Sequence, residues 1–165
     1  MIRILRLLPT KWVVNVATLG TLGRGRWMPG TIGSLAGLIW YTVCFWNSTF
    51  FQFSVLILLS IFMSILFCGE AEIRIGEKDP SRIILDEFCA MPLCFCGIGR
   101  FIPQVATWKI LFYGFLLFRF FDIVKPLGIR SLQDLKGGLG IVIDDVAAAA
   151  VTCIVLHTTV PIFFN

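Results

Sequence analysis

Residues 27–69 read WMPGTIGSLAGLIWYTVCFWNSTFFQFSVLILLSIFMSILFCG, a stretch of 43 positions without an Asp, Glu, Lys or Arg. A helix that spans a membrane needs about 20 mostly apolar residues, so this stretch is long enough for two such helices. Asn47, Ser48 and Thr49 form a polar cluster near its middle, which is typical of a turn. We therefore expect two apolar helices, over residues 31–46 and 50–69, joined by a short turn.

The whole chain has the composition of a membrane protein. Of its 165 residues, 58% are hydrophobic and 15% are charged, and the mean hydropathy is +0.90. A soluble domain is about 45–50% apolar and about 25% charged, and a disordered chain has still fewer apolar residues. The net charge of +4 is spread between apolar runs, which argues against a nucleic-acid partner.

Three further apolar segments follow, at residues 88–102, 106–121 and 140–164. The first is short and ends near Arg100 and Pro103, so it either spans the membrane or re-enters from one side. The predicted fold class is all-α: a multi-pass helical membrane protein with about four to five membrane-associated helices, in one domain over residues 1–165. Residues 1–28 are predicted to form a basic interfacial segment, and they lack the cleavage site of a signal peptide.

The basic residues predict how the chain is oriented. With five spans and the N-terminus inside, Arg100 and Lys109 alone fall toward the outer side. Lys and Arg favour the cytoplasmic side of a membrane, so we expect the N-terminus to be cytoplasmic. The twelve on that side are Arg3, Arg6, Lys11, Arg24, Arg26, Arg74, Lys78, Arg82, Arg119, Lys125, Arg130 and Lys136.

All ten carboxylates fall on that same predicted side, several of them at helix ends next to apolar sequence. Ionisable groups at the edge of the hydrocarbon are costly, so they indicate a functional site. A set of oxygen ligands without His or Cys favours a hard cation, Mg²⁺ before Zn²⁺. The candidates at helix ends are Asp86, Glu87, Asp122, Asp144 and Asp145.

Cations that suit a phosphate group stand beside these acids. Arg119 precedes Asp122 by three residues and Lys125 follows it by three, and residues three apart share one face of a helix. The alternative is that the three side chains simply neutralise one another. Asp144 and Asp145 have apolar neighbours and no basic residue close in sequence, which favours a functional role for them.

Two glycine-rich segments are candidate contacts for an anion. Residues 29–34, PGTIGS, open the first apolar helix, where free backbone N–H groups can bind phosphate; the alternative is a plain turn with Thr31 as N-cap. Residues 137–140, GGLG, either interrupt the chain before the last helix or let a head group approach the backbone.

One further pattern suggests different chemistry. Cys94 and Arg100 have the C-x5-R spacing of cysteine phosphatases, whose thiolate attacks phosphorus. That nucleophile needs a lowered thiol pKa and a polar loop, whereas the sequence around Cys94 is apolar.

Four motifs in order resemble the phosphatidylglycerophosphatase A family of bacterial membrane lipid phosphatases. The motifs are Pro29-Gly30-Thr31-x-Gly33-Ser34, Asp79-x6-Asp86-Glu87-Phe88, Phe118-Arg119-x2-Asp122-x2-Lys125-Pro126 and Gly137-Gly138-x-Gly140-x3-Asp144-Asp145. The chain departs from the family pattern at Leu127-Gly128, where a second proline is usual, and before Arg24.

The resemblance implies Mg²⁺-dependent hydrolysis of the terminal phosphate of phosphatidylglycerophosphate to phosphatidylglycerol, at the cytoplasmic face of a bacterial inner membrane. The implied metal ligands are Asp86, Glu87, Asp144 and Asp145, while Asp79 either joins them or only shapes its loop. The implied catalytic residues are Asp145, Arg119, Lys125 and Asp122, the last as either a metal ligand or the general base. Substrate contacts are expected from Thr31, Gly33, Ser34, Arg119, Lys125 and Gly138.

Other classes of function stay open at this point. A small transporter or a non-catalytic membrane subunit would also contain acids near the membrane, and a C-x5-R lipid phosphatase would use Cys94. A transporter should place charges at mid-depth, whereas these gather toward one face.

Overall fold

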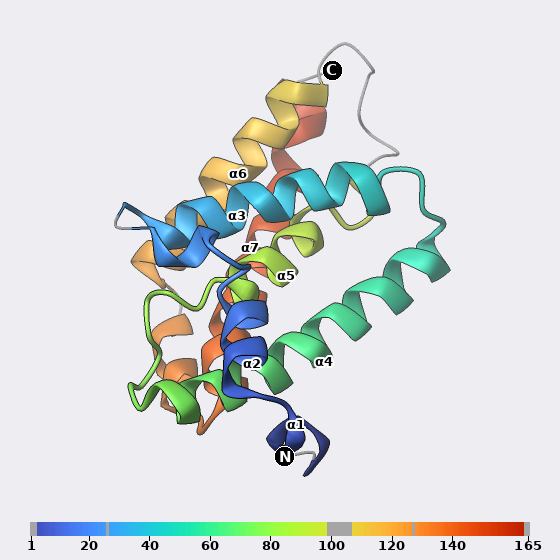
Figure 1. Ribbon diagram of the computed structural model, residues 1–165. Coiled ribbons are helices and arrows are strands. Elements are labelled where there is room, and N and C mark those ends of the chain that lie inside the picture. Colours follow the sequence, from blue (N-terminus) through green and yellow to red (C-terminus); the bar gives the residue numbers. More distant parts are fainter. Residues whose placement is uncertain (1–2, 26, 99–106, 127, 164–165) are drawn as a thin grey trace.

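The computed structural model describes residues 3–25, 27–98, 107–126 and 128–163 (Figure 1). These residues form helices and turns and contain no strand, which confirms the all-helical prediction for the described part. The long helices are α4 (Phe50–Ile75), α6 (Thr107–Val124) and α7 (Gly138–Phe163). Helix α7 packs against both α4 and α6.

The short helix α5 (Leu85–Ala90) lies among three longer ones, since it packs against α3 (Pro29–Trp40), α4 and α7. The 3₁₀ turn η3 (Met91–Phe95) continues it into an apolar cluster that contains Phe95, Phe118 and Leu156. These contacts hold the first turn of α5, with its two acids, between α3 and the N-terminal part of α7.

Helix α3 begins two residues before the expected position. Its N-cap is Met28, in the left-handed conformation with φ 45°, and Pro29 is its first residue. Proline suits that place because its missing N–H would have no partner there. Thr31 is therefore inside the first turn, so the prediction of Thr31 as N-cap is wrong. A π-helical segment, η2 (Tyr41–Phe45), ends the element.

Helix α4 begins as predicted and ends later than predicted. Thr49 caps its start, with Gln52 closing the capping box. The expected end at Gly69 is wrong, since the helix continues to Ile75 and ends at Gly76 in the left-handed conformation. Glu70 and Arg74 pair at 2.9 Å one turn apart within the helix, which removes the cost of continuing it through charged residues.

The described part of segment 88–102 contains one turn of α5 and the five residues of η3. That is too short to cross a bilayer. Residues 99–102, with Arg100, lie outside the described residues, as does the link to α6.

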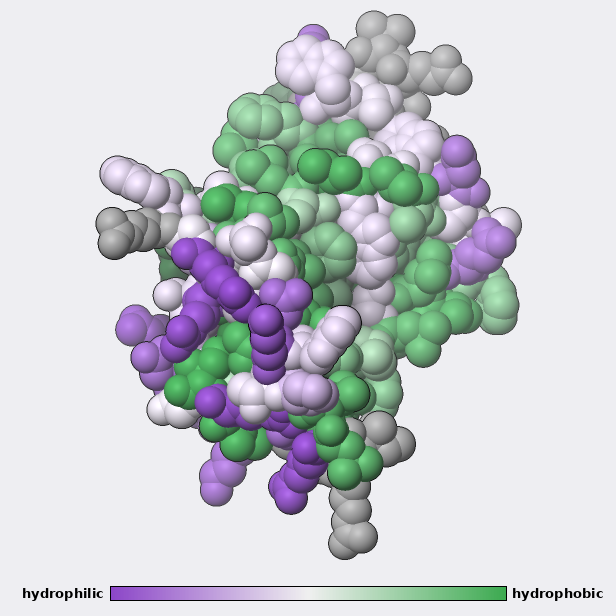
Figure 2. Space-filling model, in the orientation of Figure 1, coloured by the Kyte–Doolittle hydropathy of each residue, from purple (hydrophilic) through white to green (hydrophobic). Residues whose placement is uncertain are grey.

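Two helices in the described part, α4 and α7, are long and apolar enough to cross a membrane. Residues 29–45 form a shorter apolar helix. The outer face of α4 carries exposed Phe51, Leu58 and Phe62. In Figure 2 most of the hydrophilic side chains lie in the lower left part of the view, interrupted by apolar patches, and a smaller group lies at the right edge. Helices α1 (Arg3–Leu7) and α2 (Thr10–Ala17) lie in the lower part of the same view (Figure 1).

Candidate active site

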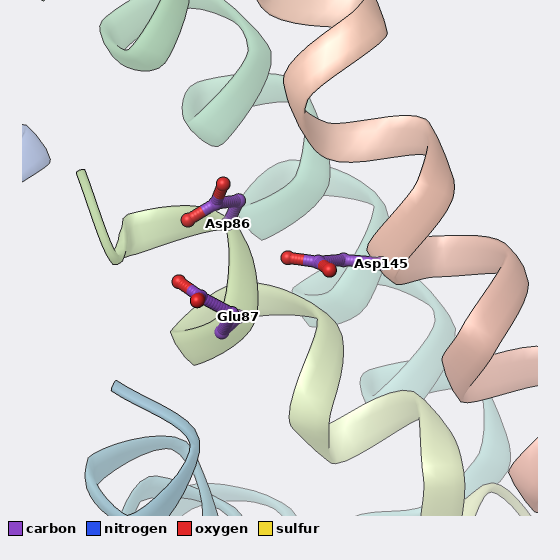
Figure 3. Close-up of side chains that lie close together, drawn as sticks. All are labelled: Asp86, Glu87 and Asp145. Carbon is purple, nitrogen blue, oxygen red and sulfur yellow. The ribbon is translucent and has the colours of Figure 1, made fainter. Parts of the chain in front are cut away.

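Three carboxylates from two helices converge at the centre of the protein. Asp86 and Glu87 come from the first turn of α5 and Asp145 from the second turn of α7, and their side chains lie close together, with Asp145 extending toward the other two (Figure 3). One oxygen from each lies within 4.8 Å of the others. We call these three residues the carboxylate trio.

The trio is buried as well as crowded. Asp86 is 6% exposed and Asp145 is 3% exposed, and Asp86 Oδ1 and Glu87 Oε2 have no hydrogen-bond partner among the described residues. Burial raises the pKa of Glu87 to about 7, and burial followed by the nearby charge of Glu87 raises the pKa of Asp86. Like charges this close disfavour ionisation of all three unless a cation offsets them. These oxygens therefore fit a hard divalent ion such as Mg²⁺.

Arg119 lies on the other side of Glu87. Its Nη1 atom is 2.6 Å from Asp122 Oδ2, 3.9 Å from Glu87 Oε1 and 3.3 Å from Ser34 Oγ, to which it donates a hydrogen bond. The Ser34 hydroxyl in turn donates to the Gly30 carbonyl at 2.8 Å. Arg119 thus joins the N-terminal part of α3 to the acids of α5 and α6.

Lys125 follows the end of α6 and reaches across to α7. Its ammonium group donates to Asp144 Oδ2 and lies 3.8 Å from Asp122 Oδ1. Its backbone has φ 48°, a conformation that costs a non-glycine residue about 1–2 kcal/mol. Although no basic residue lies near Asp144 in sequence, the fold supplies one from α6.

Gly30 allows α3 to approach the acids closely. A Cβ atom at this position would collide with Glu87 Oε1 and would lie 3.3 Å from the Arg119 guanidinium. A residue with a side chain would therefore displace both groups.

These elements enclose a cleft of about 370 Å³. It is lined by the start of α3, by α5 and the loop before it, by the end of α6 and by the start of α7. The lining includes the carboxylate trio together with Arg119 and Lys125. An anion bound in the cleft would lie close to both basic side chains and to the crowded acids.

The family model described as phosphatidylglycerophosphatase A matches residues 15–160. The chain belongs to the phosphatidylglycerophosphatase A family. It is therefore a phosphatase, and the match covers the four motifs and every residue of the cleft.

Two relatives that carry the family's name agree with this assignment, and a third similar protein has a different name. Proteins named phosphatidylglycerophosphatase A from Escherichia coli and Haemophilus influenzae are 31% and 35% identical, over 79% and 78% of this chain and 73% and 76% of their own. A Bacteroides thetaiotaomicron protein named "Putative phosphatidylinositol-3-phosphatase" is 34% identical over 81% of this chain and 84% of its own. No solved structure matches.

Most of the predicted phosphatase residues meet in the cleft. Asp86, Glu87, Asp122, Asp144 and Asp145 line it, and so do four further predicted residues, Thr31, Asp79, Arg119 and Lys125.

Asp79 lies at the edge of the cleft rather than with the trio. It is exposed, has φ 47°, and its backbone N–H donates to Glu72 Oε1 at 3.1 Å. Burial of part of the side chain and the nearby Asp144 raise the pKa of the Asp79 carboxyl.

Three predicted substrate contacts lie outside the cleft lining. Gly33 packs on Ile84, Ser34 holds Arg119, and Gly138 packs against the backbone of α4 at Ile65 and Gly69. The small size of these residues lets neighbouring helices approach each other. In sequence, small residues for helix packing give the same glycine pattern as a phosphate-binding segment.

Six residues of the cleft lining are not among the predicted site residues: Met28, Pro29, Gly30, Ser81, Ile83 and Ile141. Gly30 belongs to a quoted motif, but its contact with Glu87 depends on how α3 and α5 pack. Met28 lines the cleft next to Pro29 and was not expected to do so; no pattern in the sequence identifies it.

The cysteine alternative is not favoured by the family match or by the fold. Cys94 is fully buried in η3 within the apolar cluster of Phe95 and Ala148, and it does not line the cleft. A nucleophile must reach its substrate.

Proposed function

We propose that this phosphatase hydrolyses the terminal phosphomonoester of phosphatidylglycerophosphate, with Mg²⁺ bound by the carboxylate trio. The observation that carries the proposal is the convergence of Asp86, Glu87 and Asp145 in one cleft that Arg119 also lines, with its Nη1 atom 3.9 Å from Glu87 Oε1. Asp144 is a further ligand candidate because its Oδ1 atom is buried and has no hydrogen-bond partner among the described residues, while Asp79 would complete the site from the edge of the cleft.

When bound, the ion would lower the pKa of a water molecule and offset charge on the phosphate oxygens. Arg119 would bind those oxygens from the opposite side, held in place by Ser34 and Asp122. Lys125 would add a second positive charge from the end of α6. Preorganised charges of this kind stabilise the transferring phosphoryl group without reorganising during the reaction.

Asp122 stands between both cations and outside the trio. It would orient them or accept a proton from the attacking water. The reaction would form a bond from the water oxygen to phosphorus and break the phosphorus–oxygen bond to the lipid glycerol, and the proton taken from the water would pass to the glycerol oxygen as it leaves. Inorganic phosphate and phosphatidylglycerol are the products.

The lipid would keep its acyl chains in the bilayer and present its phosphate at the cytoplasmic face of a bacterial inner membrane. This location agrees with the excess of Lys and Arg on the predicted inner loops. Reporter fusions test the multi-pass topology: a fusion after Lys136 should report a cytoplasmic position and one after Asn47 a periplasmic position. The opposite result would reverse the proposed orientation.

Phosphate release by the detergent-solubilised protein tests the reaction. Release from phosphatidylglycerophosphate should stop with excess chelator and return with Mg²⁺, whereas release that ignores the chelator would refute the metal mechanism. Phosphatidylinositol 3-phosphate is the second substrate to compare, because one relative is named for it. Faster release from that lipid would overturn the proposed head group while leaving the metal site intact.

A further inference from the structure

The N-terminal part of the chain exposes large apolar side chains beside the cleft. Trp12 is 67% exposed, Trp27 is 83% exposed and Met28 is 65% exposed. We call residues 10–28 the N-terminal platform; residue 26 lies outside the described part. Tryptophan is enriched where a membrane meets water, because its ring is apolar and its N–H is polar.

The charge of this region is entirely positive. Five basic residues lie within the first 26 positions, and the first carboxylate of the chain is Glu70. Two of the basic residues, Lys11 and Arg24, are exposed on the platform itself. A surface that combines exposed tryptophans with basic residues and no acid is complementary to anionic lipid head groups.

The platform is one connected unit. Arg24 Nη2 donates to Asn15 Oδ1 at 3.4 Å, which joins the turn η1 (Leu22–Arg24) to α2. The Gly23 N–H donates to the Thr18 carbonyl at 2.9 Å, and a Cβ atom at Gly23 would collide with the Arg82 carbonyl. Two buried side chains of α2, Val13 and Ala17, anchor it in an apolar cluster.

This unit is tied to the catalytic acids. The Ala17 carbonyl accepts a hydrogen bond from the Ile84 N–H at 3.1 Å, two residues before Asp86. At the other end of the platform, Met28 both lines the cleft and faces outward. If the platform binds a surface, its position therefore determines how far the cleft lies from that surface.

We propose that the N-terminal platform lies in the head-group zone of an anionic bilayer, with Trp12 and Trp27 as its anchors, and that lipid head groups enter the cleft over Met28. The occupant of this surface is thus the membrane itself, and a second copy of the chain is the competing occupant. The kinetic part of the test rests on the proposed function, whereas the fluorescence part does not.

Fluorescence measures the position of Trp27 directly. A variant with W12F, W40F, W46F and W108F keeps Trp27 as its sole tryptophan and is reconstituted in vesicles that contain phosphatidylglycerol. Bromine on the upper part of the acyl chains should quench Trp27 more strongly than bromine near the chain ends. Full quenching by aqueous iodide with none by brominated lipid would overturn the proposal.

Kinetics separate membrane positioning from catalysis. The W12S/W27S variant should raise the KM, expressed as the mole fraction of long-chain phosphatidylglycerophosphate in mixed micelles, by about fivefold or more. Its kcat with a dihexanoyl substrate that is soluble as a monomer should stay unchanged. W108S, which removes an exposed tryptophan at the start of α6, is the matched control and should change neither value.

Two outcomes would overturn the assignment. Equal loss with both substrates would place the tryptophans in folding or catalysis instead of membrane binding. A dimer in detergent that W12S/W27S converts to a monomer, measured by analytical ultracentrifugation, would assign the surface to a second copy of the chain.

Discussion

Arg119 and Asp122 face each other across one turn of α6, with 2.6 Å between Nη1 and Oδ2. The same guanidinium atom donates to Ser34 Oγ on α3. The pair therefore does more than neutralise itself: Asp122 and Ser34 together fix the direction in which Arg119 faces the cleft. The planar guanidinium suits this arrangement because it can contact several acceptors in one fixed geometry.

We expect R119K to lose most of its activity although the positive charge is kept. A lysine ammonium cannot satisfy Ser34 and Asp122 while also facing the cleft, so kcat should fall by roughly a hundredfold. R82K is the control, because Arg82 forms an exposed pair with Glu77 and is not part of the cleft lining. Phosphate release under saturating substrate measures the effect, and wild-type kcat in R119K would remove Arg119 from the phosphate site.

Gly30 offers a test of the close packing between α3 and α5. G30A places a methyl group against Glu87 and Arg119, so it should lower activity by roughly tenfold or more through displacement of both groups. G25A is the matched control, since a Cβ atom there meets its nearest neighbour at 3.5 Å. Equal activities of the two variants would show that the contact with Glu87 has no catalytic role.

The carboxylate trio should reduce stability while it supports activity. D145N removes one of three crowded, buried charges, so with excess chelator its melting temperature in detergent should equal or exceed that of the wild type. Its phosphate release should fall by at least about a hundredfold, because one metal ligand is lost. D134N, an exposed change in the turn η6 (Ile129–Asp134), should alter neither value.

A D145N protein that still hydrolyses the lipid would exclude Asp145 from the site. A lower melting temperature in chelator would show instead that Asp145 has a structural partner, and would contradict the view of the trio as an electrostatic cost.

The apolar helices and the acids could be predicted from sequence because each depends on local information. The charge-free stretch of residues 27–69 predicts α3 and α4, and the turn at Asn47 and Ser48 follows from residue type. The end of α4 could not be predicted in the same way. The position of this end depends on the pairing of Glu70 with Arg74. It also depends on two hydrogen bonds that Arg74 donates, one to the carbonyl of Leu5 in α1 and one to the carbonyl of Leu8, the residue after α1.

Sequence could predict that acids and basic residues gather in one cleft, but it could not predict how they are arranged inside it. Acids on three helix ends indicate a cation site whatever the helix packing. Which of them converge depends on the fold: α5 and α7 bring Asp86, Glu87 and Asp145 together, while Lys125, the residue after α6, reaches across to Asp144. Gly33 and Gly138 could not be assigned from sequence for a similar reason. A glycine that allows close helix packing and a glycine that binds phosphate look alike in a sequence.

Cys94 decides between the two phosphatase mechanisms. The thiol is fully buried in an apolar cluster and does not line the cleft, so C94A should keep at least about half of the wild-type kcat, with a modest loss of stability from the small cavity. A cysteine mechanism requires the thiolate as nucleophile, so it predicts complete loss in C94A together with activity that survives excess chelator. Phosphate release by C94A and by the wild type, each measured with Mg²⁺ and with chelator, distinguishes the two. Full loss in C94A with a folded protein, judged by its melting temperature, would replace the carboxylate site with a thiol site.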